Sequence, residues 1–584
     1  MFLGAFHKYQ VEIFKNIKFV TPEGLVYPNT ASISFLNQSN DKIAYFELGY
    51  LGAQEIYEKI YNEEELNLSY CYIKNFSLTA YRKYFGLPKK SIVKIKKFKA
   101  HNSFFHSYVK TDFSYAFIED GHFEIENSFF LKGDVLFNNV KFGDGRKNFS
   151  YIHIKNGNLD FSGTDFGNGD VLFKNSRFSG DVLFHDSVFG EGLKDFSNVD
   201  FGNGNVLFIN TKFGDGRVVF KIANFGNGLK DFHFSTFGRG NISFEKVNFN
   251  NGDVNFSKVE FGTGKINFNR ASFGLGLVTF EGSELKESKV TFKRTIFGKG
   301  KIDFSVCNFF SSNIIFDKAD LSNTNLNFGG AKVKFLSFKH CNIDKHIDLR
   351  VKYCGELDMS DTFVRDIVDF MPTENDVLIE KIRFVGMRLM GVLLLDWNKH
   401  KIKQLITNQE DTNYLEKSEQ FRILKKNFAD LGRYYDEDKA YLEFKRYEEK
   451  AKLSKVLSDN KLNALWYYPL HLFKVLVFDK MGHYATNPLR VLSSMFVVYS
   501  FFSLIYILLI FLNLGDIVSG IGGEHSDISV VAKSFFFAAI TFLTIGYGDF
   551  YPMGIIRGLS AIEGFIGVFL MSYFTVAFVR KILR

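Results

Sequence analysis

The sequence predicts a multidomain chain: a β-solenoid, then an α-helical connector, then a region with two membrane-spanning helices. Three observations predict this order. Phenylalanines recur with alternating gaps of five and seven residues, apolar residues take helical spacing after residue 365, and two long apolar runs lie near the end of the sequence. At about 150 residues per domain, 584 residues also suggest roughly four units.

Composition excludes several classes of protein. A hydrophobic fraction of 46% and a mean hydropathy of −0.05 fit neither a disordered chain nor a protein embedded in the membrane throughout. The 71 Phe and 49 Gly, against 7 Pro, favour a repetitive architecture with glycine turns. Four scattered cysteines fit a reducing compartment rather than a disulfide framework or a cysteine-rich zinc site. The net charge of +8 does not indicate nucleic acid, and Met1–Phe14 lacks the pattern of a cleaved signal peptide.

The phenylalanine register runs from Phe113 to Phe328, with Ile or Leu at a few of its positions. One step, from Phe178 to Phe184, is six residues long and marks a one-residue deletion. The residue two before each Phe is usually small or β-branched, so both point to the same side of a short strand. Repeated Phe-Gly-x-Gly runs supply tight corners. These features predict a solenoid over residues 111–360 with stacked Phe inside.

The small-x-Phe unit resembles that of pentapeptide-repeat proteins, and this resemblance implies a right-handed β-helix. The seven-residue steps depart from the family pattern and leave the coil length open; two 12-residue units are one solution. The slot after Phe-Gly-x-Gly holds an acid at Asp170 but Asn, Arg, Lys or Leu at the other turns, so calcium binding is not expected, and no phosphate-binding loop is present. A rigid spacer or an assembly surface is the expected role.

The regions on either side of the solenoid carry other patterns. Residues 1–110 mix strand and helix patterns and are expected to cap the solenoid. Their lysine-rich stretch Lys89–Lys99 is either a solvated strand face or a contact for anionic lipid or a partner. Residues 361–461 contain an αα-hairpin, 418–432 and 436–453, which resembles the connector of pentapeptide-repeat ion-channel proteins.

Two apolar runs lie near the end of the sequence. Val491–Gly515 has no charged residue and would be about 37 Å long as a helix, enough to cross a bilayer. The second run, Gly558–Val579, contains a single charged residue, Glu563. For both runs the alternative to a membrane-spanning helix is a buried core helix. Residues 462–488 precede the first run and read as a helix at the membrane interface or as a core helix of the connector. Basic residues flank both runs, so both flanks are expected in the cytoplasm: Lys474, Lys480, Arg490, Arg580, Lys581 and Arg584.

The loop between the runs contains a short apolar segment, Val530–Leu543, that is too short to span the membrane. It reads as a re-entrant helix, with Ser526 or Asp527 as its cap. The sequence Thr-Ile-Gly-Tyr-Gly-Asp follows at 544–549. An ion without its water shell needs oxygen ligands, and glycines allow a backbone to aim successive carbonyls to one side.

This stretch resembles the potassium-channel pore signature, and residues 489–584 resemble the two-transmembrane bacterial potassium-channel family. The resemblance implies a homotetramer, because each chain supplies one quarter of a closed filter. It implies K⁺ sites at Thr544, Ile545, Gly546 and Tyr547, with Gly548 completing the filter. Thr541 and Asp549 would support the filter, and Pro552 also matches the family. Leu543 stands where family members often have Thr, which puts the packing behind the filter in doubt.

Three residues of the second run have more than one reading. Gly564 and Gly567 allow either close helix packing or an inner-helix gating hinge, and Gly567 fits the hinge better by its distance from the filter. Glu563 is expected to brace the outer pore rather than to bind ions.

Together these patterns predict a tetrameric potassium-selective channel of the bacterial inner membrane. Both termini would be cytoplasmic, and the solenoid would be a regulatory or assembly module. The expected partners are the other subunits, the bilayer and a cytoplasmic ligand or protein, without nucleic acid; no enzyme activity and no cofactor besides the permeant K⁺ are expected. The alternatives are a nonselective cation channel on the same scaffold and a membrane-anchored interaction scaffold with a vestigial pore. Cytoplasmic signals would enter through 418–453 and 462–490 by lateral contact, either between the spans or onto Arg580 and Lys581 of a neighbour.

Overall fold

The structure is a computed structural model that describes residues 6–371, 378–459, 461–520 and 528–583. The chain divides into two compact units, Met1–Ile406 and Thr407–Arg584.

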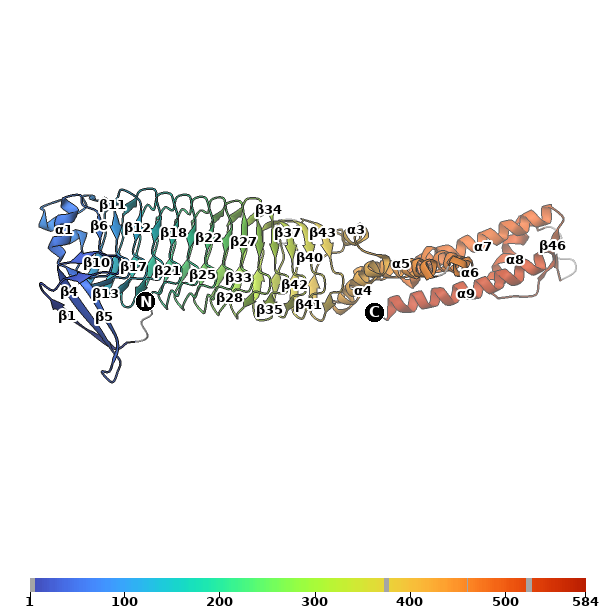
Figure 1. Ribbon diagram of the computed structural model, residues 1–584. Helices are drawn as coiled ribbons and strands as arrows, with labels where there is room; N and C mark the ends of the chain where they lie inside the picture. Colours follow the sequence, from blue (N-terminus) through green and yellow to red (C-terminus); the bar gives the residue numbers. More distant parts are fainter. Residues whose placement is uncertain (1–5, 372–377, 460, 521–527, 584) are drawn as a thin grey trace. The chain divides into compact units, whose positions relative to one another are not determined.

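The first unit is a β-solenoid whose coils stack their strands into parallel sheets (Figure 1). One sheet has 16 strands, and its main path runs from β6 (Leu66–Asn67) to β43 (Leu378–Arg383). An 18-stranded sheet and a six-stranded sheet form other faces. Paired residues lie 24 positions apart, as in Val218 and Ile242, so two 12-residue units make one coil. At the six-residue step the spacing drops to 23, and Val171 pairs with Lys194.

The core of the solenoid is built from columns of stacked phenylalanine rings. The Phe220 ring centroid lies 4.8 Å from Phe196 in one adjacent coil and 5.0 Å from Phe244 in the other, and the planes are nearly parallel. Phe208, from the neighbouring column, meets Phe220 edge to face at 5.8 Å. These rings are at most 1% exposed. The repeat therefore places rings such as Phe220 in contact both with their own column and with the column beside it.

Glycine corners allow the coils to approach one another. Gly216 has a φ of +113°, and a Cβ at this position would lie 2.1 Å from the carbonyl oxygen of Gly192 in the adjacent coil. Neither the conformation nor the space suits a larger residue. The Phe-Gly-x-Gly motif thus sets the corner of the coil.

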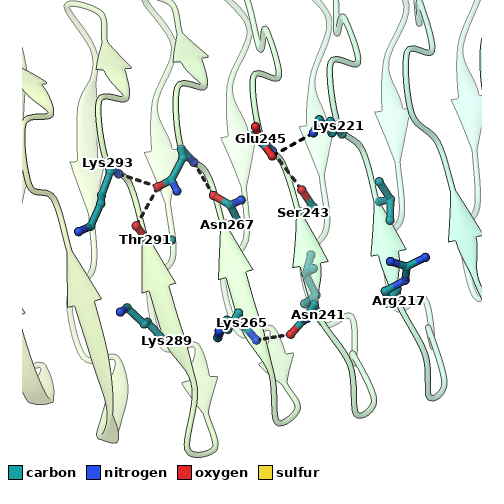
Figure 2. Close-up of a pocket in the computed structure, with 13 residues that line it drawn as sticks. Arg217, Lys221, Asn241, Ser243, Glu245, Lys265, Asn267, Lys289, Thr291 and Lys293 are labelled. Carbon is teal, nitrogen blue, oxygen red and sulfur yellow. Dashed lines mark hydrogen bonds and ion pairs between the residues drawn. The ribbon is translucent and has the colours of Figure 1, made fainter.

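The outer face of the solenoid is polar, and its outward side chains form columns across the coils. Figure 2 shows a shallow groove of about 510 Å³ on this face, lined by cations that include Arg217, Lys265 and Lys289. Some of its charges are paired, as Lys221 is with Glu245 at 3.3 Å. The groove is an exposed surface of the rod, with no stacked aromatic side chain in its lining.

The solenoid is longer than the expected 111–360. In the N-terminal region, an antiparallel sheet of β1 (Lys8–Phe14), β4 (Asn29–Leu36) and β5 (Lys42–Leu51) continues into the parallel ladder through β7 (Cys71–Lys74) and β10 (Phe104–Asp112).

At the other end the ladder reaches β45 (Val392–Leu394). The late coils have irregular lengths: Asn342 pairs with Phe363 and Val368 with Leu393. Because coils of unequal length break the period of the phenylalanines, the sequence pattern did not predict that the solenoid reaches β45.

Two short helices, α1 (Ala53–Tyr61) and α2 (Leu78–Tyr84), complete the N-terminal region. The lysine-rich stretch forms β8 (Val93–Ile95) and β9 (Phe98–Lys99). Lys94 and Lys99 lie 3.1 and 3.2 Å from Glu119 and Glu124 of the following coil. This pairing favours the solvated strand face over a binding site. A last short helix, α3 (Ile402–Thr407), follows the solenoid.

The second unit is helical. The hairpin consists of α4 (Tyr414–Asp430) and α5 (Tyr434–Asp459), joined at Gly432, and a capping box of Asn413 and Glu416 begins it. The chain continues through α6 (Lys461–Lys474), a π-helical turn η1 (Val475–Lys480) and a 3₁₀ turn η2 (His483–Ala485). Trp466 and Leu472 are 83% and 67% exposed on α6. Two long helices follow, α7 (Pro488–Phe511) and α9 (Ile556–Ile582).

Candidate ion-conduction site

The helices α7 and α9 are both long and apolar enough to cross a membrane. They have 24 and 27 residues and mean hydropathies of 2.3 and 1.8. Between them lie β46 (Gly515–Ser519), α8 (Val530–Phe542) and β47 (Phe550–Gly554). The strands β46 and β47 pair antiparallel, and the Gly520 N–H donates to the Asp549 carbonyl at 2.8 Å. These contacts join the start of the loop between α7 and α9 to its end.

Helix α8 is the short apolar helix that the sequence predicts between the two long runs. With 13 residues it is about 20 Å long, too short for a bilayer core. Its cap is Ser529, whose hydroxyl accepts from the Ala532 N–H; Ser526 and Asp527, the expected caps, lie outside the described residues. An apolar cluster joins α8 to both long helices. In it, the ring centroids of Tyr506 on α7 and Phe537 on α8 are 5.5 Å apart.

The filter segment, residues 544–548, follows directly after α8. The Thr544 and Ile545 N–H groups donate to carbonyls of the last helical turn at 3.0 and 2.9 Å. Positive φ values then occur at alternate residues: 56° at Thr544, 56° at Gly546 and 84° at Gly548. A backbone of alternating handedness can present successive carbonyl oxygens on one side, which is the arrangement a dehydrated cation needs.

The side chains of this segment are exposed on the single chain, 46% for Ile545 and 67% for Tyr547. The Thr544 hydroxyl donates to the Leu543 carbonyl at 2.7 Å. A left-handed Thr is strained, and strain of this kind concentrates at functional sites.

Both residues that are expected to support the filter accept backbone hydrogen bonds, Thr541 from residue 544 and Asp549 from outside the segment. The Thr541 carbonyl accepts from the Thr544 N–H, and the Asp549 carbonyl accepts from Gly520. Thr541 therefore holds the end of the filter nearest α8, while Asp549 ties its other end to the strand pair.

The two glycines of α9 differ in their surroundings. A Cβ at Gly567 would lie 2.0 Å from the Phe542 carbonyl oxygen, whereas one at Gly564 would lie 3.8 Å from that of Thr541. Gly567 therefore allows α9 to touch the end of α8, which supports the packing reading. The hinge stays a prediction.

Glu563 has a partner that sequence reasoning missed. The Tyr506 hydroxyl donates to Glu563 Oε2 at 2.6 Å, and both residues are fully buried. The pair joins α7 to α9 beside α8. No sequence signal could have found it, because the two residues are 57 positions apart.

The end of α9 is held by the helical hairpin of the same chain. Arg580 and Lys581 lie 3.2 and 2.7 Å from the carboxylate of Asp438 on α5, and the Arg580 guanidinium stacks over the Tyr441 ring at 4.3 Å. Asp438 is only 8% exposed. The sequence had pointed to contact with a neighbour's interfacial segment or between the spans; the structure adds α5 as the partner.

Tyr573, two turns before Arg580, contacts the segment that runs from η1 to α7. Its hydroxyl accepts from the Ala485 N–H at 2.9 Å and donates to the Phe478 carbonyl at 3.2 Å. A Cβ at Gly482 would lie 2.2 Å from the Tyr573 ring, so only glycine fits there. The three residues of η2 all have positive φ, a strained conformation that surrounds this contact.

The same segment is tied to the hairpin by Arg446 of α5, whose guanidinium lies 2.8 Å from buried Asp479. Burial alone would lower the pKa of Arg446, but its hydrogen bonds to Asp479 and the charge of Glu443 raise it. We call Asp438, Arg446, Asp479, Tyr573, Arg580 and Lys581 the inner clamp. It joins the hairpin, the segment before α7 and the end of α9.

No group of three or more His, Cys, Asp or Glu residues that could hold a metal ion occurs in the part of the chain that the structure describes.

Comparison with known proteins adds one finding. Residues 494–584 match the family model described as an ion channel. No curated protein and no solved structure matches the chain. The matched residues include most of α7 and all of α8, the filter segment and α9, which are the elements that build the site. The C-terminal part of this chain is therefore a two-helix ion-channel domain.

Proposed function

We propose that the chain is one subunit of a homotetrameric, potassium-selective channel. The alternating backbone at 544–548, held between two membrane-length helices, carries this proposal. The carbonyl oxygens of Thr544, Ile545, Gly546 and Tyr547 would replace the water shell of K⁺. Gly548 completes the alternation, and Thr541 and Asp549 hold the two ends of the segment.

Four copies are needed because one copy provides only one wall of a filter. Ile545 and Tyr547 are exposed on the isolated chain, and neighbouring subunits would cover them. The close approach of α9 to α8 at Gly567 keeps α9 directly behind the filter segment.

The charge distribution supports a cytoplasmic inner end. The clamp and the segment before α7 gather Lys480, Arg490, Arg580 and Lys581 at one end of the spans. Asp516 and Asp549 lie in the loop at the other end. By the positive-inside rule the basic end faces the cytoplasm, here of a bacterial inner membrane. The solenoid precedes the clamp in the chain and would act as a regulatory or assembly module.

A nonselective cation channel is the second candidate, and Leu543 favours it. This residue is 45% exposed next to the filter, at a position where the resembling family often has Thr. A change in packing there would loosen the filter without removing its carbonyls.

Reversal potentials in planar bilayers test these alternatives. Purified full-length protein is placed between K⁺ on one side and Na⁺ on the other. A reversal potential far from zero, with the K⁺ side negative, supports the proposal. A reversal potential near zero supports the nonselective channel. Absence of any current, with the protein inserted in the bilayer, would leave the membrane-anchored scaffold.

A further inference from the structure

We propose that a cleft between η1 and the first turns of α7 binds the phosphate headgroup of an anionic phospholipid. The cleft has a volume of about 710 Å³. Two cations, Lys480 and Arg490, line it together with apolar side chains of both elements, among them Leu476, Val497 and Val498. The inference rests on the proposed function only in placing this end of α7 at a membrane surface.

The positive charge of the cleft is not neutralised by the protein. No acidic side chain lines the cleft, and neither Lys480 nor Arg490 forms an ion pair within the described parts of the chain. The nearest acid in sequence, Asp479, is buried against Arg446 at 2.8 Å. The clamp thus pairs the carboxylate that is nearest in sequence to Lys480 with another cation.

The backbone brings the two cations together. Arg490 Nε donates to the carbonyl oxygen of Lys480 at 2.9 Å, which leaves the other guanidinium nitrogens for a ligand. Arg490 also lies in the first turn of α7, which Asn487 caps and where the helix dipole adds positive potential. The Ser494 hydroxyl, donating to the Met481 carbonyl at 2.8 Å, joins the two walls one turn further along.

The apolar wall selects a lipid rather than a small phosphate. Leu476 of η1 is 55% exposed, and Leu489 and Val497, which extend beside the cations along α7, are 74% and 65% exposed. A dissolved phosphate would leave this wall in water, whereas an acyl chain would cover it. Cations beside an apolar surface at the end of a span are the chemistry that an anionic lipid of the cytoplasmic leaflet fits.

Native mass spectrometry of the full-length protein tests the site directly. The protein is titrated in detergent with phosphatidylglycerol or with phosphatidylcholine of the same acyl chains. We expect the wild type to bind phosphatidylglycerol at least tenfold more tightly. The double variant K480Q/R490Q should lose this preference, and Lys480→Arg should keep it.

A matched control removes the same charge elsewhere. Lys455 on α5 and Arg557 at the start of α9 are both exposed, and K455Q/R557Q should bind phosphatidylglycerol like the wild type. Equal losses in the two double variants, or no preference in the wild type, would overturn the proposal. If K480Q/R490Q misfolds, K480Q alone decides, since it keeps the carbonyl that accepts from Arg490; a loss of less than threefold would count against the site.

A competition experiment with glycerol phosphate, a water-soluble phosphate, separates a lipid site from a small-phosphate site. Millimolar glycerol phosphate should not displace the lipid, and displacement at that concentration would mean a small-phosphate site instead. Lipid binding is measured without ion current. The test of this site therefore holds even if the pore proves nonselective or does not conduct.

Discussion

Lys581, near the end of α9, lies 2.7 Å from the buried carboxylate of Asp438 in the helical hairpin. Arg580 shares the same carboxylate at 3.2 Å. Two cations share one buried carboxylate, and little water competes for its oxygens, so the contact is stronger than an exposed ion pair. The last residues of α9 are thus fastened to the connector.

Removing the shared carboxylate is expected to free the end of α9. Asp438→Asn should shift the open–closed equilibrium by about five- to 100-fold, the range of typical coupling energies. Single-channel open probability measures the shift. Asp430→Asn, an exposed acid at the end of α4, is the control and should change little. An open probability equal to the wild type in both variants would show that the clamp does not control opening.

Gly482→Ala tests the grip on Tyr573. The φ of Gly482 is −140°, which alanine tolerates, so the added methyl acts only through its clash with the Tyr573 ring. We expect altered open probability in Gly482→Ala and recovery when Tyr573→Leu removes the ring. Strict additivity of the two changes would rule out the direct contact.

Gly546→Ala is expected to destroy K⁺ selectivity or conduction. Gly546 has a φ of +56°, and a Cβ added there would have no other atom within 4 Å, so the effect would come from backbone conformation rather than from a clash. A left-handed alanine costs about 1–2 kcal/mol per residue, multiplied over the four subunits. Gly558→Ala, also without a neighbour within 4 Å but helical, is the control. Reversal potentials of the two variants should differ; identical K⁺ selectivity would contradict the assignment of the filter.

The compact first unit is expected to fold alone. In a fragment of residues 1–406, Phe220→Ala should lower the free energy of unfolding by about 3–5 kcal/mol, since it removes a fully buried ring. Phe234→Ala, at a 51% exposed position, should cost less than about 0.5 kcal/mol. Chemical denaturation measures both, and similar losses would mean that the columns are not the core.

A buried lysine makes the solenoid sensitive to pH. Lys230 is 1% exposed, and burial lowers its pKa to about 8. Below pH 8 the folded protein must bury an ammonium, so this residue destabilises the fold there by about 1–3 kcal/mol. From pH 8 to about 10.5 only the unfolded chain keeps the proton, and stability therefore rises with pH.

Lys230→Met should accordingly raise the melting temperature of the 1–406 fragment at pH 7, and the gain should shrink towards pH 10. Lys221→Met is the control, because the Lys221 side chain is about half exposed and paired with Glu245. A gain at pH 7 that persists undiminished at pH 10 would come from packing and not from the charge.

The sequence by itself determined the length of the regular coil, and it located the candidate filter at 544–548. Gaps of five and seven place Phe196, Phe220 and Phe244 on one column, because a constant repeat puts equivalent residues at equivalent corners. The filter segment was equally readable, since its glycines and its position between two apolar runs are local features. The ends of the solenoid were not, because coils of other lengths carry no constant period.

Only the tertiary structure decided which residues hold the channel domain together. Tyr506 with Glu563, Gly482 with Tyr573 and Asp438 with Lys581 are pairs from different elements, 57 to 143 positions apart. Nothing in their spacing reports them, since such distances depend on how whole helices pack and on where each helix ends. Local sequence determines the period of an element and the conformations its residues allow; the partner across an interface is determined when the elements are brought together.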